Sequence, residues 1–128
     1  ADWRFVFVHQ PCHAQGWSGY HGDQRIRHLL VPLAAQVGID FIVAGHAHNY
    51  ERLIVERPGG RTHHVVVGGA GGRLEPAQSS DSPVMDRVIK THHYGRFRVA
   101  AQQVDFEMIY ADGAIRDRFT ATRKSSAK

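Results

Sequence analysis

The chain has 128 residues, 42% of them apolar, which is typical of a single globular domain or part of one. Sixteen lysines and arginines against twelve acidic residues give a net charge of +4. The basic residues are spread along the whole sequence, so we expect no nucleic-acid interface. No apolar run approaches the ~20 residues of a membrane helix, and we expect no bilayer span. The single cysteine, Cys12, excludes an internal disulfide bond.

The first third of the sequence predicts a strand, a helix and a second strand. Large apolar side chains alternate from Trp3 to Val8, as in a mostly buried strand. Between Asp23 and Gly38 the apolar residues recur at helical spacing, which predicts a helix with these two residues as its caps. Pro32 predicts a kink there, or a division into two short helices. Residues 39–44 then form an almost wholly apolar strand, so the two strands are expected to be parallel and joined by a crossover.

The remainder predicts short strands joined by turns. Two of them flank Pro58-Gly59-Gly60 as a hairpin, and the last three form an antiparallel meander with a tight turn at Asp112-Gly113. The expected fold class is therefore α/β in a mixed α+β sense, with one βαβ crossover followed by antiparallel strands. We assign residues 1–121 to one domain and 122–128 to a flexible tail.

Three histidines lie where such a sheet would bind a ligand. His9 and His46 each follow the end of a predicted parallel strand, where open α/β sheets place their ligands. His48 comes two residues after His46, within Gly-His-Ala-His-Asn-Tyr-Glu-Arg at 45–52. Neutral imidazoles suit Zn, Fe, Mn and Ni, and two histidines spaced in this way can bind one ion or two neighbouring ions. We therefore predict a metal site at this edge.

Several stretches of the sequence, taken in order, resemble the C-terminal half of calcineurin-like metallophosphoesterases. The block at residues 45–52 is most similar to the G-H-x-H-x-Y-E-R block of the purple acid phosphatase-like branch. The resemblance implies half of a four-layer α/β/β/α sandwich and a phosphoric-ester hydrolase, acid phosphatase-like in its activity. It is also compatible with a secreted or periplasmic protein. The stretches that carry it are FVFVHQP (5–11), GIDFIVAGHAHNYER (38–52), VVVGGAGG (65–72), HHYGRFRV (92–99) and ADGAIRDRF (111–119).

The resemblance implies a binuclear centre of Fe, Zn or Mn. His9 and His46 would bind one metal ion, and His48 would bind the other. The phosphate-ester substrate would be contacted by residues outside this ligand set. His21 would contact the phosphate or act as general acid, His13 stands where relatives usually have a tyrosine that contacts substrate, and Arg52 would help to hold an anion.

The acidic half of such a centre is missing from the sequence. Two divalent ions roughly 3.5–4 Å apart repel each other, so a site of this kind needs an anionic bridging ligand. Asp40 begins the strand that His46 follows and would lie about 20 Å away, while Glu51 is interpreted as a cap or an ion-pair partner. We therefore expect the chain alone to be inactive. An N-terminal half, or a second chain, is expected to cover the exposed sheet face and complete the site.

Two other functions fit the same residues. One is a mononuclear Zn protein with a three-histidine site, and the other is a non-catalytic basic binding module whose histidines are incidental. Two further histidines, His63 and His64, are consecutive in a strand, so they point to opposite faces and are interpreted as surface or strand residues.

Overall fold

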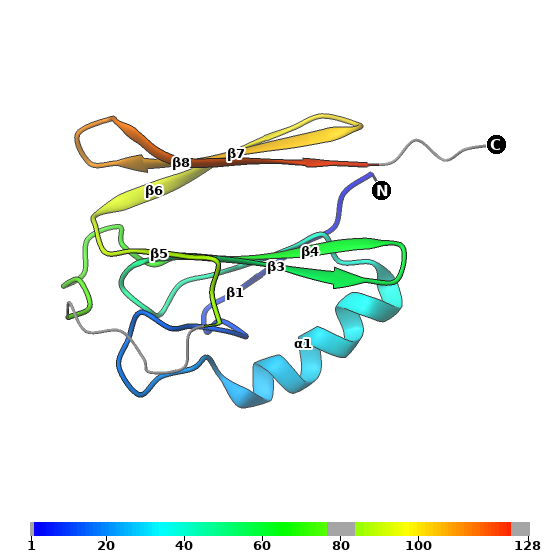
Figure 1. Cartoon of the computed structure of the whole chain (residues 1–128), viewed down its shortest axis with the longest axis horizontal. Helices are drawn as coiled ribbons and strands as arrows, with labels where there is room; N and C mark the ends of the chain where they lie inside the picture. The colour runs from blue at the N-terminus through cyan, green and yellow to red at the C-terminus, as the bar shows by residue number, and fades with distance from the viewer. Residues whose placement is uncertain (1, 77–83, 124–128) are drawn as a thin grey trace.

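The computed structural model describes residues 2–76 and 84–123, which form one helix and eight strands arranged in two sheets (Figure 1). The one helix within this part of the chain is too short to cross a membrane. In chain order the elements are β1 (Phe5–Val8), α1 (Gln24–Val37), β2 (Phe41–Ala44), β3 (Tyr50–Arg57), β4 (Gly60–Val67), β5 (Arg87–Ile89), β6 (His93–Val99), β7 (Gln103–Tyr110) and β8 (Ile115–Thr122).

The first sheet has five strands in the order β1-β2-β4-β3-β5, and the second has three in the order β6-β7-β8. β1 and β2 are parallel, with Phe5 opposite Phe41, so the predicted βαβ unit is confirmed. The predicted hairpin forms between β3 and β4, and the predicted meander forms the second sheet. The tail was predicted to begin too early, because Thr122 still belongs to β8. Residues 124–128 of that tail lie outside the described part of the chain.

The expected fold class, α/β in a mixed α+β sense as half of a four-layer α/β/β/α sandwich, is wrong, because the fold is mostly β and has three layers. Figure 1 shows α1 on one side of the first sheet and the second sheet, β6 to β8, on the other. Within residues 2–76 and 84–123, no helix covers the outer face of the second sheet. The physical reason is the spacing of apolar residues: after β2 they alternate, as strands require, and helical spacing occurs once.

Helix α1 begins and ends as its caps predict. The Asp23 carboxylate accepts a hydrogen bond from the backbone N–H of Ile26 at 2.9 Å, and Gly38 adopts the left-handed conformation with φ of 74°. Pro32 lies within one continuous helix, so the prediction of two short helices is wrong. Proline leaves the carbonyl four residues earlier without its N–H donor. That residue is the exposed His28, where water can supply the missing hydrogen bond.

The core is divided between the two faces of the first sheet. α1 packs its buried Leu30 and Ala34 against one face, together with Ile42 of β2. On the other face, aromatic rings join the two sheets, and the ring of Phe41 stacks on Phe5 with centroids 4.6 Å apart. Side chains of consecutive strand residues alternate between these faces, and each face buries apolar area from a different layer.

His63 and His64 lie in β4, and both are buried instead of exposed. The ring of His63 stacks between Phe41 and Phe119, with centroids 4.9 and 5.1 Å away. Burial lowers the pKa of His63 to about 4 and that of His64 to about 3, so both imidazoles are neutral near pH 7. A neutral imidazole can serve as a flat packing group, which sequence position alone did not indicate.

A buried ion-pair network ties the two sheets together. Asp117 of β8 accepts hydrogen bonds from Tyr50 Oη at 2.6 Å, Arg52 Nε at 2.6 Å and Arg87 Nη1 at 3.0 Å. Its side chain is only 2% exposed. Arg52, expected to bind an anionic substrate, is therefore held between the sheets by a carboxylate of this chain.

We expect Asp117→Asn to lower the free energy of unfolding by about 3 kcal/mol at neutral pH, because three donors, one of them the buried Tyr50 hydroxyl, lose a shared, charged acceptor. Burial by itself raises the pKa of Asp117, but hydrogen bonds from Arg52 and Tyr50 outweigh it and hold this pKa below its usual value. The ion pair therefore stabilises the fold above the unfolded-state pKa of about 3.9, and this contribution is lost as pH falls through the folded-state value. Urea unfolding should show the two proteins converging in stability as the solution is acidified.

Glu56→Gln is the matched control. Glu56 pairs with Arg61 at 2.7 Å, but both side chains are largely exposed. Its loss should change the free energy of unfolding by less than about 1 kcal/mol. An equally large loss in this control, or wild-type and Asp117→Asn curves that stay parallel in acid, would contradict the assigned role of Asp117.

Candidate functional site

His9 and His46 meet at the carboxyl ends of two neighbouring parallel strands. His9 follows β1 and His46 follows β2, and the backbone N–H of Gly45 donates to the carbonyl of His9 at 3.0 Å. The two rings are nearly perpendicular, with centroids 5.0 Å apart. Nδ1 of His46 and Nε2 of His9 are separated by 3.2 Å. The structure thus brings together two of the three histidines predicted as metal ligands.

The geometry of this pair fits one metal ion. At metal–nitrogen distances of about 2.1 Å, two nitrogens 3.2 Å apart subtend an angle of roughly 100°, between the octahedral and tetrahedral values. Within residues 2–76 and 84–123, no group of three or more His, Cys, Asp or Glu side chains is placed to hold a metal ion. The pair alone would provide two ligands, fewer than a complete metal site requires.

His46 occupies a strained backbone position. Its φ is 67°, and among the described residues it is the one non-glycine with a positive φ. Such conformations cluster at functional sites, where the surrounding structure holds them in place. Here the support is close packing: a side chain at Gly68 would run into the backbone of Ala47, so the glycine after β4 lets the two segments touch.

His48 lies beside this pair and faces the Gly-rich segment. Its Nδ1 is 2.7 Å from the carbonyl oxygen of Arg73, and a carbonyl can only accept, so Nδ1 carries the proton. A side chain at Gly72 would collide with the His48 ring. Nε2 of His48 is left as the acceptor nitrogen, as in histidines oriented for metal binding. The ring makes its contacts with residues 72 and 73 and none with His9 or His46 among those found in the described residues.

Two aromatic residues that were not selected from the sequence, Trp17 and Tyr20, cover His46. The rings of Trp17 and Tyr20 each lie with centroids 5.4 Å from that of His46. Burial raises the pKa of the Tyr20 hydroxyl, which is enclosed and has no hydrogen-bond partner in the described structure. The available signal was the pair of large aromatics within an otherwise polar, Gly-rich loop.

Glu51 holds the loop that carries these rings. Its buried Oε1 accepts hydrogen bonds from the backbone N–H groups of Gln15 at 2.6 Å and Gly16 at 3.2 Å. Burial raises the pKa of Glu51, although these two hydrogen bonds act in the opposite direction. Glu51 is thus a loop cap, one of the two roles expected from its sequence, and its carboxylate does not pair with Arg52, which is held by Asp117.

The two histidines expected to contact substrate, His13 and His21, have different surroundings. His13 packs against His64 under the first sheet, with ring centroids 5.0 Å apart, and burial lowers its pKa. His21 is exposed, and its backbone carbonyl accepts a hydrogen bond from Arg27 at 3.0 Å. Its neighbour Tyr20, and not His21, provides the ring that packs on His46.

No family model matches the sequence. No curated protein matches it either. A solved structure described as "GAP50 the anchor in the inner membrane complex of Plasmodium" is similar in fold, with a TM-score of 0.81 and 17% sequence identity. That similarity covers 98% of this chain and 38% of the other, so the chain spans well under half the length of the structure it matches.

These comparisons correct the resemblance drawn from the sequence. Identification as the C-terminal half of a calcineurin-like metallophosphoesterase of the purple acid phosphatase-like branch is not upheld, because no family model matches and the similar structure is described as an anchor. At 17% identity the structural match shows the fold alone. Function must therefore be argued from the site and not from membership of a family.

We expect His46→Gly to be more stable than His46→Ala by about 1 kcal/mol, because alanine keeps the left-handed strain and glycine removes it. Urea unfolding of the two variants measures this difference directly. His48 is the matched control, since it lies in the same turn at a negative φ. There the order should reverse, with His48→Ala the more stable. A His46→Gly variant no more stable than His46→Ala would show that residue 46 is not strained.

Proposed function

We propose that this chain supplies the histidine half of a metal-dependent phosphoric-ester hydrolase. The observation that carries the proposal is the His9–His46 pair, with nitrogens 3.2 Å apart at the ends of β1 and β2. Strained backbone at His46 supports it, because strain of this kind is retained where it positions a functional side chain. His48, with its Nδ1 proton fixed by Arg73, is the candidate ligand for a neighbouring ion.

A bound divalent ion would supply hydroxide near neutral pH and would offset charge on the phosphoryl oxygens. The chain's own residues prepare the site for that ion. His9 and His46 present two nitrogens, Trp17 and Tyr20 shield one side of His46 from water, and Glu51 holds the loop on which these aromatics lie.

The carboxylates that such a centre requires would come from further polypeptide. Support comes from the open side of the fold next to β1, which pairs with β2 alone. On this edge strand the side chain of Phe7 is 70% exposed, and Leu29 of α1 is 62% exposed. A large apolar side chain exposed on a free edge strand, as Phe7 is, favours a covering partner, either an N-terminal half or a second chain.

Metal binding tests the first step of the proposal. Isothermal titration of the chain with Zn²⁺ and with Mn²⁺ should show saturable binding. His9→Ala and His46→Ala should each weaken it by at least about tenfold, since loss of one ligand removes more than about 1.4 kcal/mol. His28→Ala is the matched control, because His28 is exposed on α1 and should not affect binding. Unchanged binding in His46→Ala would exclude the pair as the metal site.

The hydrolase itself is tested with a chromogenic phosphate ester and added Zn²⁺ or Mn²⁺. We expect negligible turnover by the 128-residue chain, because within residues 2–76 and 84–123 no carboxylate joins these histidines in a metal-binding group that could bridge two ions. Addition of the polypeptide that covers β1 and brings acidic ligands should restore turnover, and His46→Ala should abolish it. A mononuclear three-histidine Zn protein would instead bind one ion whose affinity falls equally in His9, His46 and His48 variants.

A second candidate function is a non-catalytic anchor or binding module. The observation that favours it is the similarity to a structure described as an anchor, together with the absence of a three-ligand cluster from the described residues. If this candidate is correct, His9 and His46 bind no metal ion. The exposed apolar side beside β1 would then be the surface that contacts a partner. The titration above therefore separates the two functions.

A further inference from the structure

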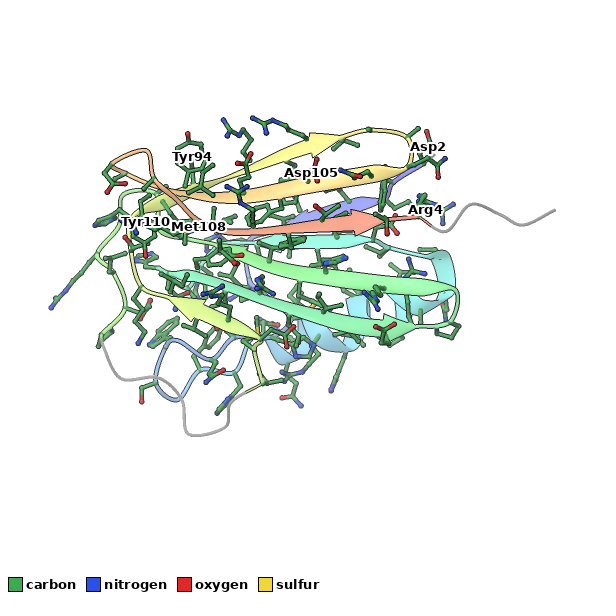
Figure 2. The ribbon with its side chains drawn as sticks, turned by 45° about the horizontal axis from the view of Figure 1, so that its top comes forward. Asp2, Arg4, Tyr94, Asp105, Met108 and Tyr110 are labelled. Carbon is green, nitrogen blue, oxygen red and sulfur yellow. The ribbon has the colours of Figure 1, made fainter. Side chains whose placement is uncertain are left out.

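A cavity of about 800 Å³ opens at the end of the sandwich opposite the histidine pair. It lies where β1 begins and where α1 and β8 end, between the two sheets. Arg4 lines it, and His9 is five residues further along β1, about 16 Å away in an extended strand. Figure 2 shows Asp2 and Arg4 at this end of the molecule, close to the end of β8. The cavity is therefore separate from the candidate metal site.

The charges that line this cavity are mainly positive. Four arginines contribute to its wall, against the carboxylates of Asp40 and Glu56. Asp40 is already shared by two of them, since it accepts from Arg57 Nη2 at 3.1 Å and from Arg123 Nη2 at 3.1 Å. Glu56 pairs with Arg61 at the rim. The four arginines are Arg4, Arg57, Arg61 and Arg123.

Two guanidinium groups converge above a single glycine. Nη1 of Arg4 and Nη1 of Arg57 lie 3.8 and 3.6 Å from the position that a Cβ would take on Gly38. Within the described residues, Arg4 forms no ion pair with a carboxylate. Arg57 is already paired with Asp40, so the uncompensated charge at this point is that of Arg4, and an anion held between the two guanidinium groups would offset it.

A buried imidazole on the cavity wall also lacks a partner. His63 is 6% exposed, and its Nδ1 makes no hydrogen bond in the described structure. Its ring is fixed between Phe41 and Phe119, so its orientation cannot adjust to find one. Burial lowers the pKa of His63 to about 4, so its ring is neutral near pH 7 and the charge on this wall comes from the arginines and carboxylates.

We infer that this cavity binds a small organic molecule carrying two or more oxyanion groups, as phosphate or carboxylate. Guanidinium groups such as those of Arg4 and Arg57 bind phosphate and carboxylate alike, and both reach the same point above Gly38. The excess of two positive charges on the wall matches a dianion. The volume lies in the usual range for small-molecule sites, and Trp3 and Phe119 provide apolar wall for the organic part.

The test uses isothermal titration of the whole chain at low salt with three probes: ADP, citrate and inorganic phosphate. Arg4→Gln should weaken binding of ADP or citrate by about tenfold, the effect of losing one charge-assisted contact. Arg61→Gln is a second variant. Arg61 lies at the exposed rim and pairs with Glu56, so its loss leaves the ion pairs of Asp40 with Arg57 and Arg123 intact. Arg25→Gln is the matched control, because its side chain is 90% exposed on α1 and carries the same charge.

Indole N–H signals in nuclear magnetic resonance locate the binding. Trp3 lines the cavity and donates its Nε1–H to the carbonyl of Ala100 at 2.7 Å, whereas Trp17 packs on His46. The probes should shift the Trp3 signal and leave that of Trp17 in place. Binding of ADP alone would assign a phosphorylated ligand, and binding of citrate alone a polycarboxylate. Absence of saturable binding, an equal loss in Arg25→Gln, or a shift confined to Trp17 would overturn the inference.

Discussion

The short strand β2 is the element on which the rest of the structure depends. Each of its four residues, Phe41 to Ala44, is buried, because α1 covers one face and the second sheet covers the other. β1 and β4 pair with it on both sides, so its backbone hydrogen bonds are fully used. A strand enclosed on all sides cannot shift without opening both cores. Whatever lies at its two ends is therefore held rigidly.

Both candidate sites are built at those ends. His46 follows the carboxyl end of β2, and the parallel pairing with β1 sets the position of His9 beside it. Asp40 precedes the amino end, where it accepts from the backbone N–H of Arg4 and from the side chains of Arg57 and Arg123. One end thus presents two imidazoles, and the other presents ion pairs with surplus arginines. A single rigid strand separates two chemically different surfaces.

Local patterns in the sequence predicted most of the elements and the meeting of one residue pair. Alternation, helical spacing and the caps at Asp23 and Gly38 depend on neighbouring residues, so the βαβ unit, the hairpin and the meander could be predicted. His9 and His46 could be placed together because both follow parallel strands. The layer number could not be predicted in this way, because it depends on which segments pack together.

Contacts between distant segments carried no local signal. Arg123 reaches Asp40 from 83 residues away, and Arg52 meets Asp117 across 65 residues. His63 was interpreted as a surface or strand residue because its burial depends on Phe119, which belongs to the last strand. The resemblance to a metallophosphoesterase, in which residues 45–52 matched best, is also a statement about more than local structure. Short motifs determine a turn and the position of its side chains, but they do not determine the function of the complete molecule.

Buried polar groups of this fold differ in how far their hydrogen bonds are satisfied. Asp117 has three donors, so its buried charge stabilises contact between the sheets and leaves nothing to bind a ligand. Tyr20 Oη and His63 Nδ1 are also enclosed, yet within the described structure each lacks a partner, and they lie at opposite ends of β2, beside His46 and on the arginine-lined cavity. An unsatisfied buried polar atom costs about 1–3 kcal/mol. Enclosed atoms of Asn49, Glu51, His64 and His93 also lack partners in the described structure, so an unsatisfied atom by itself does not mark a ligand site. The two candidate sites depend instead on the geometry of the His9–His46 pair and on the arginines of the cavity wall.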